Sequence, residues 1–335
     1  MKLINPSPPI STSSARHAGI DAGRWVAFIA VVILHVFPTH DSGTVSWRAI
    51  LDVICRFAVP FFFLASGFFL SQKPKGFWNE LTSKIRRLFP LFVVWAIFYI
   101  VLSPPPVTVF FSAYFLKDLL INGGPGFHLW FLPSLGFCLA LFIILKRFFS
   151  QTVLLGFGAV LYCLGLSYGE FENYPGLPDM HWDVRNGPFF GFFFIAIGYF
   201  FKRKQFAPSP AHCLLLAGTG LLCQLAEADL LFVSEIRGFA DDINFYFGTV
   251  AYACGVFLYC STLKANRGVL KLAAELGKYT LGFYCLHVAI IWMLDRLSHP
   301  VTFMDRTQEV METIMLTVLF VLAMRRYNWS SRLIK

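Results

Sequence analysis

The sequence contains few charged residues. Asp, Glu, Lys and Arg together make up 14% of the 335 residues, whereas about a quarter of a typical soluble domain is charged. Hydrophobic residues make up 57% of the chain. This composition excludes an ordinary soluble domain and indicates an integral membrane protein.

Three other features are absent. The eight cysteines show no metal-ligand spacing and all lie within or at the ends of apolar runs, so we interpret them as packing residues rather than disulfides or ligands. No small-residue cleavage site follows the first apolar run, which indicates a retained membrane span rather than a signal peptide. The sequence also lacks an internal repeat and the matching interrupted helices that many transporters show.

What the sequence does contain is a series of about ten apolar runs of helical length. They cover residues 19–39, 48–71, 85–103, 127–146, 152–168, 187–201, 211–226, 243–262, 278–298 and 309–325. Most of the 28 Lys and Arg residues lie between alternate runs, on the side that both chain ends share. Since cytoplasmic loops are rich in Lys and Arg, we expect an all-α bundle of about ten transmembrane helices with both termini in the cytoplasm.

These runs predict a single membrane domain over residues 19–326, without a soluble partner domain. Residues 1–18 are rich in Ser and Pro and are expected to form a disordered cytoplasmic tail. Residues 327–335 are expected to form a second cytoplasmic tail. The net charge of +9 is explained by the Lys and Arg residues of the expected cytoplasmic loops, so it does not require a nucleic-acid partner.

The first run carries two ionisable side chains in an otherwise apolar stretch. Arg24 lies near its start and His35 near its end. Eleven residues turn an α-helix through about 1100°, so both side chains share one face and lie roughly 16 Å apart along the axis. Asp21, three residues before Arg24, shares that face. Such groups are typical of a pathway or a reaction centre, although a lone membrane histidine is often only hydrogen-bonded to a neighbouring helix.

The second run contains a charged pair and a proline. Asp52 and Arg56 are four residues apart, so they can pair on one helix face, either as a structural pair or as part of a site. Pro60 predicts a kink in this helix. Ser66 and Gly67 are small and predict the close approach of a neighbouring helix.

Three basic residues, Lys84, Arg86 and Arg87, precede the third run. Taken alone, they are most simply explained as anchors on the cytoplasmic side of the membrane. They are also suited to a phosphate clamp, because the guanidinium group of arginine matches the geometry of phosphate oxygens. Both interpretations stay open at this point.

Two later runs contain histidines beside aromatic residues. His128 and Trp130 open the fourth run near the outer interface, where a tryptophan is expected in any case. Tyr284 and His287 lie three residues apart on one face of the ninth run, near the middle of the membrane. Together with His35, these histidines could suggest a metal site, but few carboxylates accompany them and His128 is expected to lie well above His287. We therefore assign no metal.

Taken in order, these motifs resemble the acyltransferase-3 family of integral membrane acyltransferases over about residues 15–325. The matching motifs are Arg24-x10-His35, Arg56-x-x-Val59-Pro60 with Ser66-Gly67, Arg86-Arg87 with Pro90, His128-Leu129-Trp130, and Tyr284-x-x-His287. The chain is most similar in kind to the small O-acetyltransferases of enterobacterial common antigen and exopolysaccharide pathways. The family's Arg-x-x-Arg segment is Lys84-x-x-Arg87 here, which leaves open which basic residue contacts the donor.

The resemblance implies an O-acyltransferase, most often an O-acetyltransferase, of the bacterial inner membrane. The donor would be cytoplasmic acetyl-CoA, and the acceptor a hydroxyl of a lipid-linked sugar or an exported glycan. His35 would act as catalytic base or acyl relay, since a neutral histidine can accept the proton of a hydroxyl. Arg24 would orient the donor, and Arg24, Lys84, Arg86 and Arg87 would bind its phosphates.

The remaining motif residues are expected to bind substrate or to support these groups. They are Asp21, Asp52, Arg56, Ser66, His128, Trp130, Tyr284 and His287. Whether an acyl-histidine forms first or the hydroxyl attacks the thioester directly does not follow from the residues. A transporter that exports a glycan or a small metabolite without chemistry is the alternative, since ten spans and a buried histidine fit it too.

Overall fold

The computed structural model describes residues 17–37, 47–71, 76–170, 184–206, 208–233, 243–298 and 302–327. Within these ranges the chain is helical and contains no strand. The predicted tails at 1–18 and 327–335 lie almost wholly outside the described residues.

Fourteen α-helices and three short helical segments make up the described chain. The α-helices are α1 (Ala18–Val36), α2 (Trp47–Cys55), α3 (Ala58–Phe68), α4 (Phe77–Leu102), α5 (Val107–Phe110), α6 (Ala113–Asn122), α7 (Phe131–Leu145), α8 (Gln151–Gly165), α9 (Pro188–Arg203), α10 (Pro210–Val233), α11 (Phe247–Thr262), α12 (Gly268–Gly277), α13 (Thr280–Ser298) and α14 (Phe303–Met324). The short segments are η1 (Phe127–Trp130), η2 (Leu166–Glu170) and η3 (Val184–Asn186). Each predicted apolar run coincides with one helix or with two consecutive helical segments.

The prediction of an all-α polytopic bundle is confirmed. Among the described residues, eight helical stretches are long and apolar enough to cross a membrane. The two other predicted spans correspond to α9 and α11, which have 16 residues each and are shorter. Both pack against several other helices, since α9 contacts α3, α7 and α8, and α11 contacts α1, α3 and α10.

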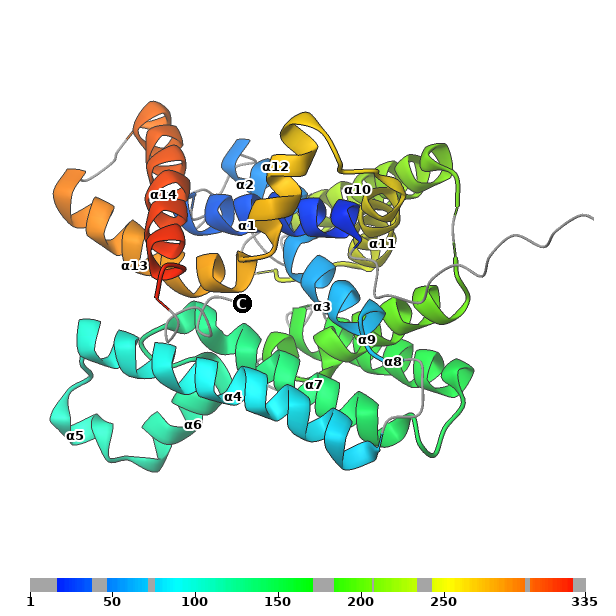
Figure 1. Cartoon of the computed structure of the whole chain (residues 1–335), viewed down its shortest axis with the longest axis horizontal. Coiled ribbons are helices and arrows are strands. Elements are labelled where there is room, and N and C mark those ends of the chain that lie inside the picture. The colour runs from blue at the N-terminus through cyan, green and yellow to red at the C-terminus, as the bar shows by residue number, and fades with distance from the viewer. Residues whose placement is uncertain are drawn as a thin grey trace, which may run out of the picture.

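The helices form two groups that α3 and α9 join. Figure 1 shows α4 to α8 on one side and α1 with α10 to α14 on the other. Between the groups α3 packs against α9; α3 also contacts α1 and α11, and α9 also contacts α7 and α8. The predicted functional side chains lie on α1, α4, η1 and α13, so they come from both groups of helices.

Glycines allow α3 and α9 to lie in close contact. A Cβ atom at Gly67 of α3 would overlap the carbonyl oxygen of Ile195, and one at Gly198 of α9 would overlap that of Leu64. This confirms the predicted close approach at Gly67. Buried phenylalanines fill the space beside this contact, for example Phe63, which packs against aromatic rings of α7 and α9.

The second predicted run is interrupted just before Pro60, and the interruption is a break rather than a kink. α2 ends at Cys55 and α3 begins at Ala58, so the break lies at residues 56–57. Pro60 occupies the first turn of α3, and because it cannot donate to the carbonyl of Arg56 four residues earlier, the helix does not continue across the break. The break leaves Arg56 at the junction of the two helices.

Candidate functional site

Three histidines from distant parts of the chain meet inside the bundle. His35 lies at the end of α1, His128 in η1 and His287 in α13. The ring centroids are 5.2 Å apart for His35 and His287, 5.1 Å for His128 and His287, and 6.5 Å for His35 and His128. His128 and His287 are buried, and His35 is partly exposed. We call these three residues the histidine cluster.

Backbone carbonyls fix the proton position on two of the rings. Nδ1 of His287 donates to the carbonyl oxygen of Tyr284 at 2.6 Å, and Nε2 of His128 donates to that of Cys285 at 3.4 Å, because a carbonyl can only accept. The opposite nitrogens, Nε2 of His287 and Nδ1 of His128, are buried and have no hydrogen-bond partner in the described part of the chain. Each of these nitrogens can therefore accept a proton.

His128 does not lie well above His287, and that expectation was wrong. The physical reason is that hydrogen bonds to α13 hold η1 at the depth of the cluster. The hydroxyl of Tyr284 donates to the carbonyl oxygen of His128. The hydroxyl of Tyr99, whose ring packs against His128, donates to the carbonyl oxygen of Cys285 at 2.9 Å.

The close approach of three histidines does not produce a recognisable metal site. Over the described ranges, no group of three His, Cys, Asp or Glu side chains is arranged to hold a metal ion. Aromatic rings complete the surroundings instead, since the centroid of Phe127 lies 5.3 Å from that of His35 and the centroid of Phe28 lies 6.0 Å from that of His287.

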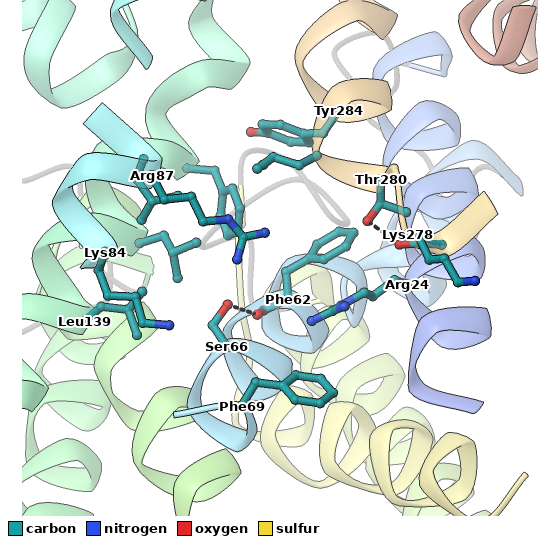
Figure 2. A pocket seen from close by; sticks show the side chains of 15 residues that line it. Arg24, Phe62, Ser66, Phe69, Lys84, Arg87, Leu139, Lys278, Thr280 and Tyr284 are labelled. Carbon is teal, nitrogen blue, oxygen red and sulfur yellow. Dashed lines mark hydrogen bonds between the residues drawn. The ribbon is translucent and has the colours of Figure 1, made fainter. Parts of the chain in front are cut away.

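A cavity of about 140 Å³ lies beside the histidine cluster, and we call it the basic cavity. Four cationic side chains line it: Arg24 of α1, Lys84 and Arg87 of α4, and Lys278, which lies between α12 and α13. Figure 2 shows Lys84 and Arg87 on one side of it and Arg24 on the other, while the side chain of Lys278, whose ammonium group donates to Glu275, points away. Side chains of α3, α7 and α13, most of them apolar, line the rest. Such a cavity suits an anionic ligand with a thin apolar part.

A buried carboxylate holds Arg24 in place. Nη1 of Arg24 donates to Oδ1 of Asp21 at 2.8 Å, and the guanidinium carbon lies 5.0 Å from the ring centroid of Phe69. Ser66 also lines the cavity, and its hydroxyl donates to the backbone carbonyl of Phe62 at 2.8 Å. Arg24 therefore enters the cavity with its orientation fixed by neighbouring side chains.

The three basic residues that precede the third span do not all lie on the same face of α4. Lys84 and Arg87, three residues apart, share a face of α4 and line the cavity, whereas Arg86 does not line it. Lys278 is the fourth cation, and no motif surrounds it in the sequence that would single it out.

Tyr284 connects the basic cavity to the histidine cluster. Its side chain lines the cavity, and its ring centroid lies 5.5 Å from that of His128 and 5.7 Å from that of His287. Phe131, which also lines the cavity, packs against the same tyrosine with a centroid distance of 5.4 Å. The wall of the cavity is therefore in ring contact with two of the three histidines.

Two arginines outside α1, Arg56 and Arg185, lie near His35. Arg56 makes two hydrogen bonds to Asp52, from Nε at 2.6 Å and from Nη2 at 2.9 Å, which confirms the predicted pair. Arg185 of η3 lies with its guanidinium carbon 5.1 Å from the ring centroid of Trp130. Both arginines are close enough to act electrostatically on His35. Arg185 follows no motif, and the charge pattern alone would place it in an outer loop.

Comparison with known proteins places the chain in a family. The family model described as "Acyltransferase domain" matches residues 17–324, nearly the whole chain. An amino-acid racemase of Enterococcus faecalis is 26% identical over 209 residues, which are 56% of this chain and 28% of that protein. A serine/alanine racemase of Enterococcus gallinarum is 26% identical over 235 residues, which are 63% of this chain and 33% of that protein. The matched regions thus span at most about a third of these relatives, and no solved structure matches the chain.

Proposed function

The chain belongs to the acyltransferase-3 family and is therefore an integral membrane acyltransferase, and we propose that it is an O-acetyltransferase of the bacterial cytoplasmic membrane. In this proposal, acetyl-CoA from the cytoplasm is the donor, and a hydroxyl of a cell-envelope or exported glycan is the acceptor. One observation carries the proposal: a cavity lined by four cations shares Tyr284 with a cluster of three histidines.

The basic cavity supplies what a CoA thioester needs. Its diphosphate carries negative charge that Arg24, Lys84, Arg87 and Lys278 would neutralise, and arginine forks pair well with phosphate oxygens. The thin pantetheine arm would follow the apolar wall toward Tyr284. Arg86 does not line the cavity, so the proposed donor site contains Lys84 and Arg87 without it.

His35 is the proposed catalytic base. Its neutral ring accepts the proton of the acceptor hydroxyl while the hydroxyl oxygen attacks the thioester carbonyl carbon. A carbon–oxygen bond forms, the carbon–sulfur bond breaks, and the sulfur leaves as the thiolate of CoA. The proton held by His35 then passes to that sulfur, so the products are an acetyl ester and free CoA.

The other predicted site residues support this reaction by contact. Nε2 of His287 and Nδ1 of His128 are buried acceptors beside His35, so they can hold its proton between the two steps. Asp21 orients Arg24, and Asp52 orients Arg56 near His35. Trp130, which packs beneath Arg185, is proposed to contact the acceptor sugar.

The experiment that tests the proposal is transfer of labelled acetyl from acetyl-CoA to a glycan acceptor by the purified protein. We expect covalent label on the glycan and release of CoA, and we expect folded His35→Ala protein to give neither. Retained transfer by that variant would refute the role of His35. Label on the protein in the absence of acceptor would identify His35 as an acyl relay rather than a base.

The same experiment separates the proposal from its alternative. Movement of unmodified solute without release of CoA would favour a transporter. The racemase names of the two relatives describe proteins of which this chain matches at most about a third, so racemisation is not part of the proposal.

A further inference from the structure

A second cavity lies on the other side of the end of α3. It has a volume of about 690 Å³, several times that of the basic cavity, and we call it the wide cavity. Phe68 lines the wide cavity, and the next residue, Phe69, lines the basic cavity. Their ring centroids are 5.4 Å apart. Two adjacent aromatic side chains therefore form the boundary between the two cavities.

Two cations of the wide cavity have no carboxylate partner among the residues that the structure describes. Lys202 and Arg203 line it, and neither forms a salt bridge within the described residues. Nζ of Lys202 instead donates to Nε2 of His17 at 3.4 Å and lies 4.9 Å from the ring centroid of Phe68. A neutral imidazole and an aromatic ring hold this ammonium group but leave its charge available to an anion.

Flat rings and hydrogen-bonding groups line the same space. Phe201 and Phe206 lie nearly parallel, with an interplanar angle of 14° and centroids 5.6 Å apart. Tyr199 and Gln205 also line the cavity. Gln205 has a φ of 50°, a left-handed conformation that is uncommon for residues other than glycine and that often occurs at binding sites. Aromatic faces, an amide and two cations together suit a nucleotide better than a phosphate alone.

We propose that the wide cavity binds the adenosine 3′-phosphate portion of the CoA donor, while the basic cavity binds its pantetheine arm and diphosphate. This inference rests on the proposed function. CoA consists of a bulky nucleotide with its own 3′-phosphate and a thin arm, and the protein offers a wide and a narrow cavity side by side. Lys202 and Arg203 pair with the 3′-phosphate, and the rings beside them contact the adenine.

Direct binding of labelled adenosine 3′,5′-bisphosphate to the purified protein in lipid nanodiscs tests the site without requiring transfer. We expect Lys202→Ala to weaken binding about tenfold or more, as the loss of a charged hydrogen bond to phosphate would, and Lys202→Arg to restore most of it. Lys271→Ala is the matched control, because Lys271 is exposed on α12 and lines neither cavity. A thermal unfolding curve for each variant confirms that it is folded.

Three outcomes would overturn the nucleotide site: binding of the bisphosphate that does not depend on Lys202, equal competition by inorganic phosphate, or displacement by anionic lipid in the nanodisc. If acetyl transfer proceeds while any of these holds, the proposed function stands and this inference fails. If the bisphosphate binds in a Lys202-dependent manner but acetyl-CoA yields no transfer, the nucleotide site stands and the proposed function fails.

Discussion

Among single residues, the position of the proton on each histidine ring decides what the cluster can do. A ring that donates through one nitrogen to a backbone carbonyl keeps the lone pair of its other nitrogen for the site. His287 is held in this way by the carbonyl oxygen of Tyr284, and its Nε2 remains a buried acceptor. Because the rings of His35 and His287 are 5.2 Å apart, the acceptor of one ring lies within reach of the other.

Replacement of His287 should therefore slow the chemistry more than donor binding. We expect His287→Ala to lower kcat by about 10²- to 10⁴-fold, the usual contribution of a group that handles a proton, and to leave the KM for acetyl-CoA nearly unchanged. Steady-state transfer assays measure both constants. His212→Ala is the matched control, since His212 is exposed and lies outside the cluster. A kcat equal to that of the unaltered protein would show that His287 has only a packing role.

The surroundings of His17 lead to a prediction about the stability of the protein at acidic pH. Burial, and next the positive charge of Lys202, lower the pKa of His17 below its ordinary value of 6.5, while Asp21 acts in the opposite direction. At pH values between the lowered pKa and 6.5, the unfolded chain binds more protons than the folded chain. The contribution of His17 to stability is therefore full above pH 6.5 and is lost as the pH falls from 6.5 through the lowered pKa.

The His17→Gln variant should consequently lose less stability in acid than the unaltered protein. The measurement is the thermal unfolding midpoint at about pH 7.5 and about pH 5.5, the range over which histidine titrates. The other titratable groups of the molecule are common to both proteins and cancel in the comparison. An equal drop in midpoint for both proteins would contradict the lowered pKa.

Pairs within one helix turn were predictable from sequence, whereas contacts between helices were not. The Asp21–Arg24 and Asp52–Arg56 pairs follow from spacings of three and four residues. Lys278 lies far along the chain from Arg24, Lys84 and Arg87, the other cations of the basic cavity, and the packing of α12 and α13 against α1 brings it there. No local pattern in the sequence could have identified it.

On the scale of the helix, the twist of α4 places its basic residues on different faces. Successive side chains turn by about 100°, so Lys84 and Arg87 share a face while Arg86 points elsewhere. We expect Lys84→Ala and Arg87→Ala each to raise the KM for acetyl-CoA about tenfold or more, through loss of a charged hydrogen bond. Arg86→Ala is an internal control and should change it less than about twofold. Equal effects at all three positions would mean that general positive charge, rather than the cavity, attracts the donor.

The contact of α3 with α9 gives a prediction about stability. Gly67→Ala and Gly198→Ala would each force a methyl group against a backbone carbonyl of the facing helix, which backbone shifts can relieve only at a cost of about 1–3 kcal/mol. Gly156→Ala in α8 is the matched control, because nothing lies within 4 Å of its added Cβ and alanine favours a helix. Unfolding of the three variants in detergent measures the difference, and equal stability would show that the two helices can separate freely.

Helix existence was more predictable than helix continuity. Apolar length located every predicted span on a helix, because only helices of that length satisfy their backbone groups in lipid. Pro60 indicated a disturbance of this helix, but not that the helix would break completely at residues 56–57. A proline can begin a helix as well as bend one, and sequence alone does not separate these two roles.

For the whole molecule, the decisive property is which side of the membrane the basic cavity faces. Lys84, Arg87 and Lys278 belong to the basic clusters that the positive-inside rule assigns to the cytoplasm, and Lys202 and Arg203 of the wide cavity belong to another. Both cavities should therefore open on the side where acetyl-CoA is made. His35 lies roughly 16 Å farther along α1 than Arg24, at 1.5 Å per residue, so the reaction should occur deep in the bilayer.

Sealed vesicles of known orientation test this arrangement. We expect externally added labelled acetyl-CoA, which does not cross a bilayer, to support transfer in inside-out vesicles and not in right-side-out vesicles. Permeabilising the right-side-out vesicles with detergent should restore transfer and so shows that the protein in them is active. Transfer in intact right-side-out vesicles would place the cations of both cavities on the outer side. That result would reverse the orientation inferred from charge, and the donor would then have to come from outside the cell.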